Sequence, residues 1–551
     1  MDMTRLAATF LAALGLAGGA PADHVYRVVK HPAAERAHQA PSAIASVFVA
    51  GHGWGHGIGL AQYGAYGYAL HGWTYDKIVA HYYPGTELGK ATVSRVRVLL
   101  APHARRVVIS SQAAFVVRDG KGKKHKLRAG AQALGTGLKL KLGNAKRLKA
   151  LPGPLLFSPP ATGPLSFGSR AYRGSLRVKV VAGGLQVVNI VGLDPYLWGV
   201  VPSEMPQRWP AEALAAQAVV ARSYALSHLR KGGDFDLYPD TRDQMYLGVS
   251  AEAPSASDAV NETSGDVVLY DGAVADTYFF SSSGGKTANV QDVWPSSPAL
   301  PYLVSVPDPY DTLSPYHDWG PLRFSAQTLA KRLHVPGGKV TDFRANVASS
   351  GRVRTITFVG ASGERTAAGG TVRAALGLRS TWFHLGLLSL SNPRGAVVYG
   401  SPATLSGVAR GVSAITLESR VYGGAWKRGA RLTARNGAVS VTVRPKATTD
   451  YRLESGGFRS ASVRVSVAPL VQLAAGGDGV SVTGTVRPVF AGADAQIQRL
   501  DSGSWATLAH ATIAADGSYS IPLALTSGSY RARVAPGHGF AAGLSATLVV
   551  Q

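Results

Sequence analysis

Residues 197–226 read LWGVVPSEMPQRWPAEALAAQAVVARSYAL, and this stretch decides how the middle of the chain folds. Prolines frame a short loop that carries one carboxylate, Glu204, and an alanine-rich segment follows at once. Alanine is the strongest helix former, and Pro210 suits the first turn of a helix. We expect a helix from Pro210 to about Leu229 that ends before Gly232-Gly233 and packs closely against neighbouring backbone.

Upstream of this helix the pattern is that of short strands. Ser175–Val181 and Leu185–Val191 alternate apolar and polar residues, and Gly183-Gly184 between them predicts a tight hairpin turn. The mixture of strands with a few helices continues from residue 44 to about residue 390. We therefore predict an α+β catalytic domain over residues 44–390, rich in β-strands and with one prominent alanine-rich helix.

The composition changes after about Asn392 to short alternating strands separated by Gly, Ser and Asn turns. Two similar segments are visible, in which Trp426 corresponds to Trp505 and Asn436-Gly437 to Asp516-Gly517. Repeated short strands of this kind are typical of β-sandwiches. We predict two all-β modules of immunoglobulin-like type, over residues 396–466 and 467–551.

The first residues have the pattern of a secretory signal. Arg5 precedes an apolar run, and small residues near Ala22 suit a cleavage site. We expect a signal peptide over residues 1–22, a flexible spacer over residues 23–43 and a secreted protein that works outside the cell or in the cell wall. The chain has no cysteine, so its stability cannot depend on disulfide bonds.

The charge balance is strongly basic, with a formal net charge of +25. Such a charge attracts polyanions, which for a secreted protein could be anionic wall polymers or a membrane surface. Lys and Arg are dispersed along the chain, which disfavours a nucleic acid partner. The densest cluster, Lys121–Lys126, is expected at a hairpin tip, where a solvated surface explains it equally well.

Glu204 lies in an apolar part of its loop. Val200, Met205 and Trp209 are close to it in the sequence, and burial among such side chains raises the pKa of a carboxyl group. A glutamic acid that keeps its proton near neutral pH can act as a general acid. The alternative is a structural glutamate that caps a helix or pairs with Arg208.

A second block, residues 51–64, reads GHGWGHGIGLAQYG. His52 and His56 have the spacing of a zinc-binding pair on a helix, but the alternating glycines argue against a helix. A glycine-lined loop that lets a ligand approach the backbone fits better, with the imidazoles donating hydrogen bonds. Zinc held by His52, His56, His71 and His81 is the weaker alternative.

A third block, residues 281–287, reads SSSGGKT and follows a strand-like segment. It lacks the full spacing of a phosphate-binding loop and the sequence around a nucleophilic serine. We expect this loop to bind sugar hydroxyl or acetamido groups, and a plain turn is the alternative.

Together these blocks resemble the SpoIID/LytB family of bacterial cell-wall proteins. Residues 197–226 are similar to the core signature of the family, and residues 277–285 are similar to its second block. The resemblance covers about residues 47–390. Further matching stretches are Tyr172-Arg-Gly174, Val188-Asn189, Val293-Trp294, Pro301-Tyr-Leu303, residues 314–319 (SPYHDW), residues 373–381 (RAALGLRST), residues 53–65 and residues 81–86 (HYYPGT).

The resemblance implies a lytic transglycosylase that acts on the glycan strands of peptidoglycan. It implies that Glu204 is the single general acid and base, cleaving between N-acetylmuramic acid and N-acetylglucosamine and leaving a 1,6-anhydro sugar. One carboxylate suffices, because no water needs to be activated. No metal or cofactor is expected. The residues that we expect to bind substrate are His56, Gln62, Gln217, Arg222, Ser282, Ser283 and Gly284.

The family name also supplies the alternative function, a non-catalytic wall-binding protein that enhances a partner amidase. The basic charge and the two predicted sandwich modules suit that role. The expected partners are peptidoglycan glycan strands, with anionic wall polymers and a cell-wall amidase as further candidates.

Two features depart from the family pattern. The glycine-histidine block comes last in the family and first in this chain, which leaves the site intact if the permuted ends lie close together. Some members hold zinc through histidine and cysteine near the segment that corresponds to residues 236–245. Because this chain has no cysteine, we expect no metal there.

Overall fold

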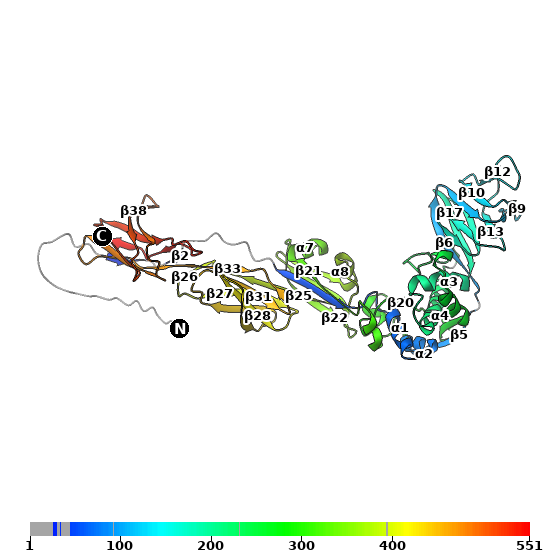
Figure 1. The fold of residues 1–551 in the computed structure, drawn as a ribbon, viewed down its shortest axis with the longest axis horizontal. Helices are drawn as coiled ribbons and strands as arrows, with labels where there is room; N and C mark the ends of the chain where they lie inside the picture. The colour runs from blue at the N-terminus through cyan, green and yellow to red at the C-terminus, as the bar shows by residue number, and fades with distance from the viewer. Residues whose placement is uncertain (1–25, 30–32, 35–44, 92, 231, 393–394) are drawn as a thin grey trace, which may run out of the picture. The chain divides into compact units, whose positions relative to one another are not determined.

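The computed structural model describes residues 26–29, 33–34, 45–91, 93–230, 232–392 and 395–551. The chain forms two compact units. The first unit comprises the described residues up to Phe48 together with Arg323–Ala326 and Gly386–Gln551, and the second comprises Val49–Leu322 and Gln327–Leu385. As the sequence predicts, the fold is rich in strands and has several parts (Figure 1). The chain passes between the units at four points, which lie within β3 (Ser46–His52), β21 (Asp318–Ser325), the start of α7 (Ala326–Leu333) and β25 (Phe383–Ser391).

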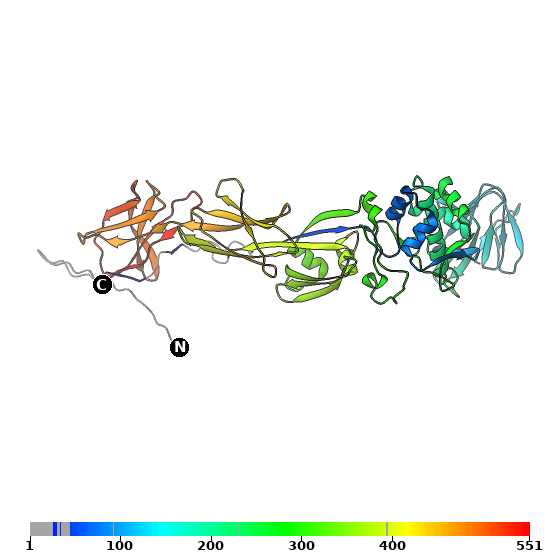
Figure 2. The same ribbon diagram turned by 90° about the horizontal axis from the view of Figure 1, so that it is seen from below.

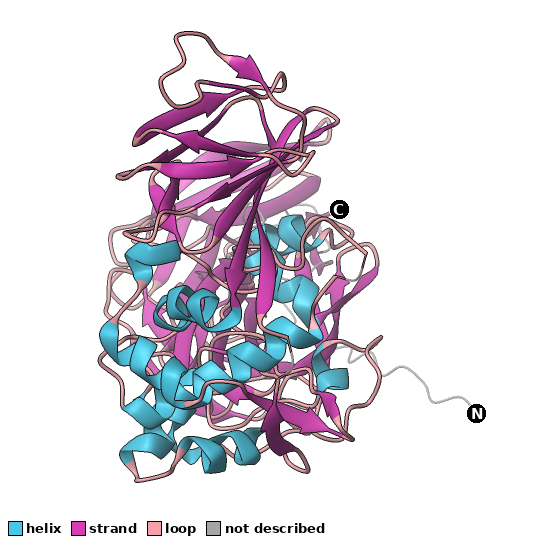
Figure 3. Ribbon diagram, turned by 90° about the vertical axis from the view of Figure 1, so that its right-hand side faces the viewer, coloured by secondary structure: helices cyan, strands magenta, loops and turns pink. Residues whose placement is uncertain are grey.

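Helix α4 (Ala211–Ser227) lies at the centre of the helical part of the second unit. Its residues from Ala213 to Ala225 are all buried, as expected of a helix that is apolar on every side. Pro210 precedes the first turn, where the sequence placed the start of a helix. The helices that pack against α4 are α1 (Gln62–Leu70), α2 (Tyr75–Tyr82), α3 (Leu193–Glu204) and α5 (Pro254–Glu262), drawn in cyan in Figure 3.

A β-rich module, inserted between α2 and α3 in the sequence, adjoins these helices (Figure 2). The predicted hairpin is confirmed, because β16 and β17 pair in antiparallel register from Ser175–Ile190 to Val181–Gly184. The main sheet has the order β6 (Arg95–Ala104), β17 (Gly184–Gly192), β16 (Ser175–Val181), β13 (Leu155–Ser158), β8 (Phe115–Arg118) and β9 (Lys124–Leu127). A second sheet has the order β10 (Gly130–Leu134), β7 (Val107–Ser111), β14 (Leu165–Phe167) and β15 (Arg170–Tyr172), and β11 (Lys139–Leu140) pairs with β12 (Lys149–Ala150).

Small sheets and short helices complete the second unit. The pair formed by β4 (Leu60–Ala61) and β20 (Phe279–Phe280) is parallel and joins two segments that are far apart in the sequence. The other strands are β5 (Glu87–Lys90), β18 (Asp266–Tyr270), β19 (Ala273–Val274), β22 (Val340–Val347), β23 (Val353–Gly360) and β24 (Glu364–Ala368). The short helices are η1 (Gly248–Ala251), α6 (Val290–Val293), η2 (Pro309–Leu313), α7 (Ala326–Leu333) and α8 (Gly369–Leu376).

The first unit consists of strands around two separate hydrophobic cores. One core contains Leu388, Leu405 and Leu453, and the other contains Ile497 and Tyr530. Around the first core lie β26 (Ala396–Val398), β27 (Ala403–Arg410), β28 (Ile415–Val421), β29 (Lys427–Leu432), β30 (Ala438–Val443), β31 (Thr449–Ser455), β32 (Phe458–Arg459) and β33 (Val463–Ala468). Around the second lie β34 (Leu470–Val471), β35 (Ala474–Ala475), β36 (Ser481–Arg487), β37 (Asp494–Asp501), β38 (Ser504–Thr512), β39 (Ser518–Pro522), β40 (Gly528–Val534), β41 (Gly543–Leu544) and β42 (Leu548–Val550). The immunoglobulin type and the predicted module bounds stay predictions.

The N-terminal region differs from the expected flexible spacer. Within residues 23–43, β1 (Tyr26–Val28) pairs with β42 and β2 (Ala33–Ala34) pairs with β41. Strands of three and two residues are too short to show alternation, so the sequence gives no sign of them. The predicted signal peptide, residues 1–22, lies outside the described residues. None of the helices in the described part of the chain combines the length and the hydropathy needed to cross a membrane.

Candidate active site

Glu204 is the last residue of α3, and its side chain is half-buried. The backbone N–H of Met245 donates a hydrogen bond to Oε1 at 3.0 Å, and the side chain of Gln62 donates a second one. Burial raises the pKa of the Glu204 carboxyl above its ordinary value, and these two hydrogen bonds oppose the shift because they stabilise the charged form. The sequence anticipated this direction from the apolar loop.

Aromatic rings cluster at the loop that follows Glu204. Trp209 is buried next to the loop that follows α3, and Tyr66 stacks on it with a centroid separation of 4.7 Å. Tyr63 meets the same indole edge-on at 5.0 Å. Gln62 and Tyr63 are consecutive residues at the start of α1, so one turn of helix supplies both a hydrogen-bond partner and a ring to the surroundings of Glu204.

The glycine-histidine block and the Ser-Gly loop lie side by side. Trp54 and Ser282 exchange both of their backbone hydrogen bonds, at 2.8 and 3.0 Å, and the N–H of Tyr63 donates to the carbonyl of Ser281. Gly53 has φ of +70°, and a Cβ there would lie 2.5 Å from the Ser282 carbonyl oxygen. Glycine is therefore required at this position by both conformation and contact. Together with the Gln62 contact, this brings the three predicted blocks together in the second unit.

Both ring nitrogens of His56 form hydrogen bonds within the protein. Its Nε2–H donates to the carbonyl of Phe279 at 3.0 Å, and its Nδ1 accepts the N–H of Ile58 at 3.1 Å. Burial lowers the pKa of His56 to about 4, so the ring is neutral. The ring also packs against Phe280 and Trp294. The contacts are those of a residue that holds the glycine-rich loop in place, and not of one that offers a hydrogen bond to a ligand.

Each of the other histidines that the sequence offered as zinc ligands bonds a different partner. His52 pairs with Asp318 at 2.6 Å, His71 bonds the carbonyl of Gly67, and His81 bonds the carbonyl of Pro307. Among the described residues no group of three metal-binding side chains is arranged to hold an ion.

The Ser-Gly loop wraps around a carboxylate that the sequence analysis missed, Asp311. Its oxygens accept hydrogen bonds from the Ser282 hydroxyl at 3.0 Å and from the N–H groups of Ser283 and Gly284 at 2.7 and 2.8 Å. His317 Nδ1 lies 3.0 Å from the same carboxylate. Asp311 thus fixes the loop conformation, and the serine hydroxyl at 282 serves the fold. No sequence signal identifies this residue, since Asp308-Pro-Tyr-Asp311 has the composition of an ordinary turn.

A second buried carboxyl group, Asp308, lies next to Asp311. Burial raises the pKa of Asp308 to about 7, and the nearby Asp311 adds to the shift. The hydroxyls of Ser283 and Tyr82 are its neighbours. Asp308 therefore titrates in the neutral range beneath the same loop.

Arg222 and Gln217 both lie in the interior along α4. The guanidinium of Arg222 is fully buried, pairs with Asp194 at 2.9 Å and donates to the carbonyls of Val260 and Asp266. Asp194 lies in the first turn of α3 and Glu204 ends the helix, so the two are about 15 Å apart along its axis at about 1.5 Å per residue. Arg222 is therefore engaged in the fold, away from Glu204. The amide of Gln217 is fully buried, and within the described residues its two polar atoms have no hydrogen-bond partner.

A row of rings extends from Tyr63 along the glycine-histidine block. Trp54 is 40% exposed and meets Tyr316 edge-on at 4.4 Å. The guanidinium of Arg379 lies over both rings, 4.9 Å from Trp54 and 4.3 Å from Tyr316. Burial raises the pKa of the Tyr63 hydroxyl, and the nearby Tyr316 adds to this shift. We call Trp54, Tyr316, Tyr63 and Trp209 the aromatic row.

The segment that supplies Met245 is organised by ion pairs. Asp236 pairs with Arg97 at 2.6 Å, and Asp243 pairs with Arg230 at 2.8 Å and accepts the N–H of Tyr238. Here the two carboxylates are neutralised by arginine and no cysteine is available, so the residues do not fit a zinc site.

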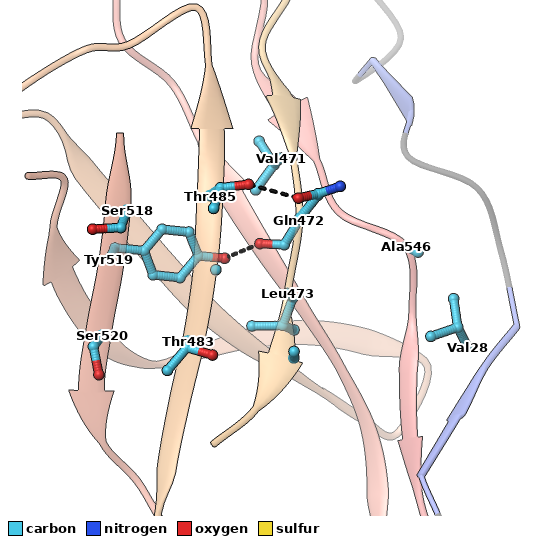
Figure 4. Close-up of a pocket in the computed structure, with 12 residues that line it drawn as sticks. Val28, Val471, Gln472, Leu473, Thr483, Thr485, Ser518, Tyr519, Ser520 and Ala546 are labelled. Carbon is cyan, nitrogen blue, oxygen red and sulfur yellow. Dashed lines mark hydrogen bonds between the residues drawn. The ribbon is translucent and has the colours of Figure 1, made fainter. Parts of the chain in front are cut away.

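A cavity of about 700 Å³ lies in the first unit, whereas Glu204 belongs to the second (Figure 4). Tyr519 packs against Gly484 and donates to the Gln472 carbonyl, and the Thr485 hydroxyl donates to the Gln472 side chain. Its lining holds no carboxylate, histidine or cation, so it offers no acid–base chemistry.

Comparison with known proteins places these blocks in context. A family model described as SpoIID, stage II sporulation protein, matches residues 181–270, which include Glu204. Stage II sporulation protein D of Bacillus subtilis is 30% identical over 243 residues, which cover 40% of this chain and 69% of that protein. An uncharacterised protein of Brachyspira hyodysenteriae is 39% identical over 138 residues, covering 24% of this chain and 37% of that protein. The amidase enhancer of Bacillus subtilis is 40% identical over 116 residues, covering 21% of this chain and 15% of that protein. This chain thus spans less than two thirds of the length of the last two relatives.

Proposed function

Because the chain belongs to the SpoIID family, we propose that it is an exported enzyme that cleaves the glycan strands of peptidoglycan as a lytic transglycosylase. The observation that carries this proposal is the environment of the Glu204 carboxyl group. Burial raises the pKa of its carboxyl group, while hydrogen bonds from Met245 and from Gln62, the residue before Tyr63 of the aromatic row, hold it in place. A carboxylic acid in that state can give up a proton and then take one back.

Each step balances without water. Protonated Glu204 donates its proton to the oxygen that joins N-acetylmuramic acid to N-acetylglucosamine, and the bond from that oxygen to the muramic C1 breaks. The oxocarbenium-like centre at C1 is then attacked by the C6 hydroxyl of the same sugar. The Glu204 carboxylate removes the hydroxyl proton, so the enzyme is regenerated and a 1,6-anhydro ring closes.

The acid nearest upstream of Glu204 in the sequence is engaged by other groups, which agrees with a route that uses one carboxylate. Hydrolysis by inversion needs a second carboxylate to activate water, about 6.5–9.5 Å from the first. Asp194, the nearest acid upstream in the sequence, lies in the first turn of α3 and is bound by Arg222 and Ser264. The hydrogen bonds from Gln62 and Met245 suit the negative charge that Glu204 acquires after the first proton transfer.

The aromatic row supplies a surface for the sugars themselves. Pyranose rings present C–H groups on their faces, and indole and phenol rings offer apolar faces with polar edges. Trp54 and Tyr316 are exposed enough to be covered by a ligand, and the Arg379 guanidinium holds both rings in place. A glycan strand that lies along the row would pass Tyr63 and reach Glu204.

The test is digestion of purified glycan strands followed by mass spectrometry of the products. Products that end in 1,6-anhydro-N-acetylmuramic acid support the proposal, and reducing ends heavier by one water would overturn it in favour of hydrolysis. Glu204→Gln should abolish turnover and leave the melting temperature unchanged. Glu87→Gln is the matched control. Glu87 is exposed on β5, so this variant should cleave glycan at the normal rate.

Enhancement of a partner amidase is a second candidate function. It is favoured by the 40% identity to a protein that is named amidase enhancer. If it holds, adding the protein to a cell-wall amidase raises the rate at which stem peptides are released. Adding the Glu204→Gln variant raises that rate by the same amount. Sugar release by the purified protein alone would show that enhancement is not its whole activity.

A further inference from the structure

The β-rich module of the second unit carries a large excess of positive charge. Asp119 is the only acidic residue in the sequence between Glu87 and Asp194, whereas lysines and arginines occur throughout that interval. Every Lys and Arg from Arg118 to Lys149 is exposed. This part of the chain therefore accounts for much of the net charge of +25.

Two hairpins collect these charges. The β8–β9 hairpin carries Lys121, Lys123, Lys124 and Lys126, and the β11–β12 hairpin carries Lys139 and Lys149 in its strands. The N–H of Gly143 donates to the carbonyl of Lys126 at 2.9 Å, and Arg128 bonds the Asn144 side chain. The hairpins are therefore neighbours, and β9 and β12 are labelled at the same end of the module in Figure 1.

The charges are displayed by folded strands. Leu127 is buried between the exposed Lys126 and Arg128, and Leu140 is buried between the exposed Lys139 and Lys141. Alternation along a strand sends these leucines inward and the cations outward. The surface is thus a fixed feature of the fold.

Nothing within the described residues neutralises this surface. Asp119 is buried, bonds His125 at 2.8 Å and accepts the N–H groups of Lys121 and Lys123, so it shapes the turn. In the described part of the chain, no ion pair joins a lysine or arginine of residues 118–149 to a carboxylate. A concentration of like charge that is left unpaired on a folded surface favours an anionic partner.

The side-chain chemistry narrows the class of that partner. Residues 118–150 contain no Phe, Tyr or Trp, so they offer no rings on which nucleic acid bases could stack. A surface that binds lipid presents a face of aromatic and leucine side chains. These residues have no such face, since Leu148 is the one large apolar side chain among them that is strongly exposed. Lysines outnumber arginines, and lysine binds phosphate as a point charge without demanding a fixed geometry.

We propose that the β8–β9 and β11–β12 hairpins form a binding surface for a linear polymer of polyol phosphates, a polyanion with regularly spaced phosphodiesters and no bases. The flexible polymer lies across both hairpins, and each lysine releases counterions as it meets a phosphate. The surface is separate from Glu204 in function, so it anchors the protein to a phosphate-rich matrix whether or not glycan is cleaved.

The experiment measures binding of the full-length protein to immobilised synthetic poly(glycerol phosphate) at about 0.15 M salt. One variant changes Lys121, Lys123, Lys124 and Lys126 to Gln, and a second changes Lys139, Lys141, Lys146 and Lys149 to Gln. The matched control changes Lys77, Lys331, Lys427 and Lys446 to Gln, which removes the same charge from exposed sites elsewhere. Each hairpin variant should bind roughly tenfold more weakly and with a shallower salt dependence, while the control stays within about twofold.

Equal losses in the hairpin variants and the control would overturn the proposal, because net charge alone would then explain binding. Tighter binding of the unchanged protein to single-stranded DNA or to phosphatidylglycerol vesicles than to the polymer would overturn it in favour of those partners. Cleavage of soluble glycan should be the same in all of these proteins, so this result is independent of the role proposed for Glu204.

Discussion

The side chain of Gln62, at the first residue of α1, hydrogen-bonds the carboxyl group of Glu204, at the last residue of α3. Two signature blocks that are far apart in the sequence therefore meet at one ionisable group. The bond stabilises the charged form of Glu204 and partly offsets the effect of burial on its pKa. This relationship ties the glycine-histidine block directly to the proposed chemistry.

Replacing Gln62 by Leu should shift the pH dependence of cleavage. Without the hydrogen bond, the pKa of Glu204 rises further, so the acid form persists to higher pH. The alkaline limb of kcat/KM should move upward by about one pH unit, because a hydrogen bond to a charged group contributes roughly 1.5 kcal/mol. A Gln207→Leu control changes an exposed glutamine of the neighbouring loop and should leave the profile in place. An unshifted limb in Gln62→Leu would contradict the role given to this bond.

Asp243→Asn should disturb the segment that presents Met245 to Glu204. Asp243 is nearly inaccessible, pairs with Arg230 and accepts the Tyr238 N–H, so losing its charge loosens the loop. We expect kcat to fall roughly tenfold with little change in KM and the free energy of unfolding to fall by about 1–3 kcal/mol. Chemical denaturation and steady-state kinetics measure both effects.

The matched control for this substitution is Asp240→Asn. Asp240 forms an exposed pair with Arg242 in the same segment, and exposed pairs contribute little to stability. If both variants lost kcat equally, the specific path through Asp243 and Met245 would be ruled out.

Asp308 should make the stability of the protein depend on pH in the neutral range. Its folded-state pKa is about 7, well above the ordinary value of 3.8, so the folded protein keeps a proton that the unfolded chain releases. Stability therefore falls as pH rises from about 4 to 7, by up to about 1.4 kcal/mol per pH unit, and levels off above pH 7. The groups that face Asp308 are Asp311, Ser283, Tyr82 and His317.

Thermal melts of the unchanged protein and Asp308→Asn across this range provide the measurement. The variant cannot ionise at this position, so its melting temperature should decline less between pH 5 and 8. The two curves should converge at the acid end, where both side chains are neutral. Parallel curves over the whole range would show that Asp308 does not titrate there.

The sequence carried enough information to predict the helix after Pro210 and the β16–β17 hairpin, and both are present in the structure. The family predicted from the sequence is also confirmed. It also pointed to the direction of the pKa shift at Glu204, because its apolar neighbours in the chain, Val200, Met205 and Trp209, are themselves buried. These features depend on short-range patterns, and short-range patterns are what a sequence displays.

The remaining features depend on contacts between distant segments. Arg222 was predicted to bind substrate, yet it is a buried partner of Asp194, a pairing across two helices that no local pattern reveals. The same limit hid Asp311, whose partners lie in the Ser-Gly loop. His56 was correctly placed in a glycine-lined loop, but the carbonyl of Phe279 that occupies its Nε2 belongs to another strand.

The aromatic row leads to a prediction about binding. Trp54→Ala should raise KM for long glycan strands roughly tenfold and leave kcat nearly unchanged, because Trp54 packs on Tyr316 in the row, whereas Glu204 is hydrogen-bonded by Met245 and Gln62. The ring is 40% exposed, so its loss should cost the fold little. Tyr422→Ala, which removes an exposed ring from the first unit, is the matched control and should leave KM unaltered. Short fragments that fill only the cleavage position should be turned over equally by Trp54→Ala and the unchanged protein. A fall in kcat on those fragments would instead place Trp54 in the chemical step, and the row would lose its role as an extended surface for the strand.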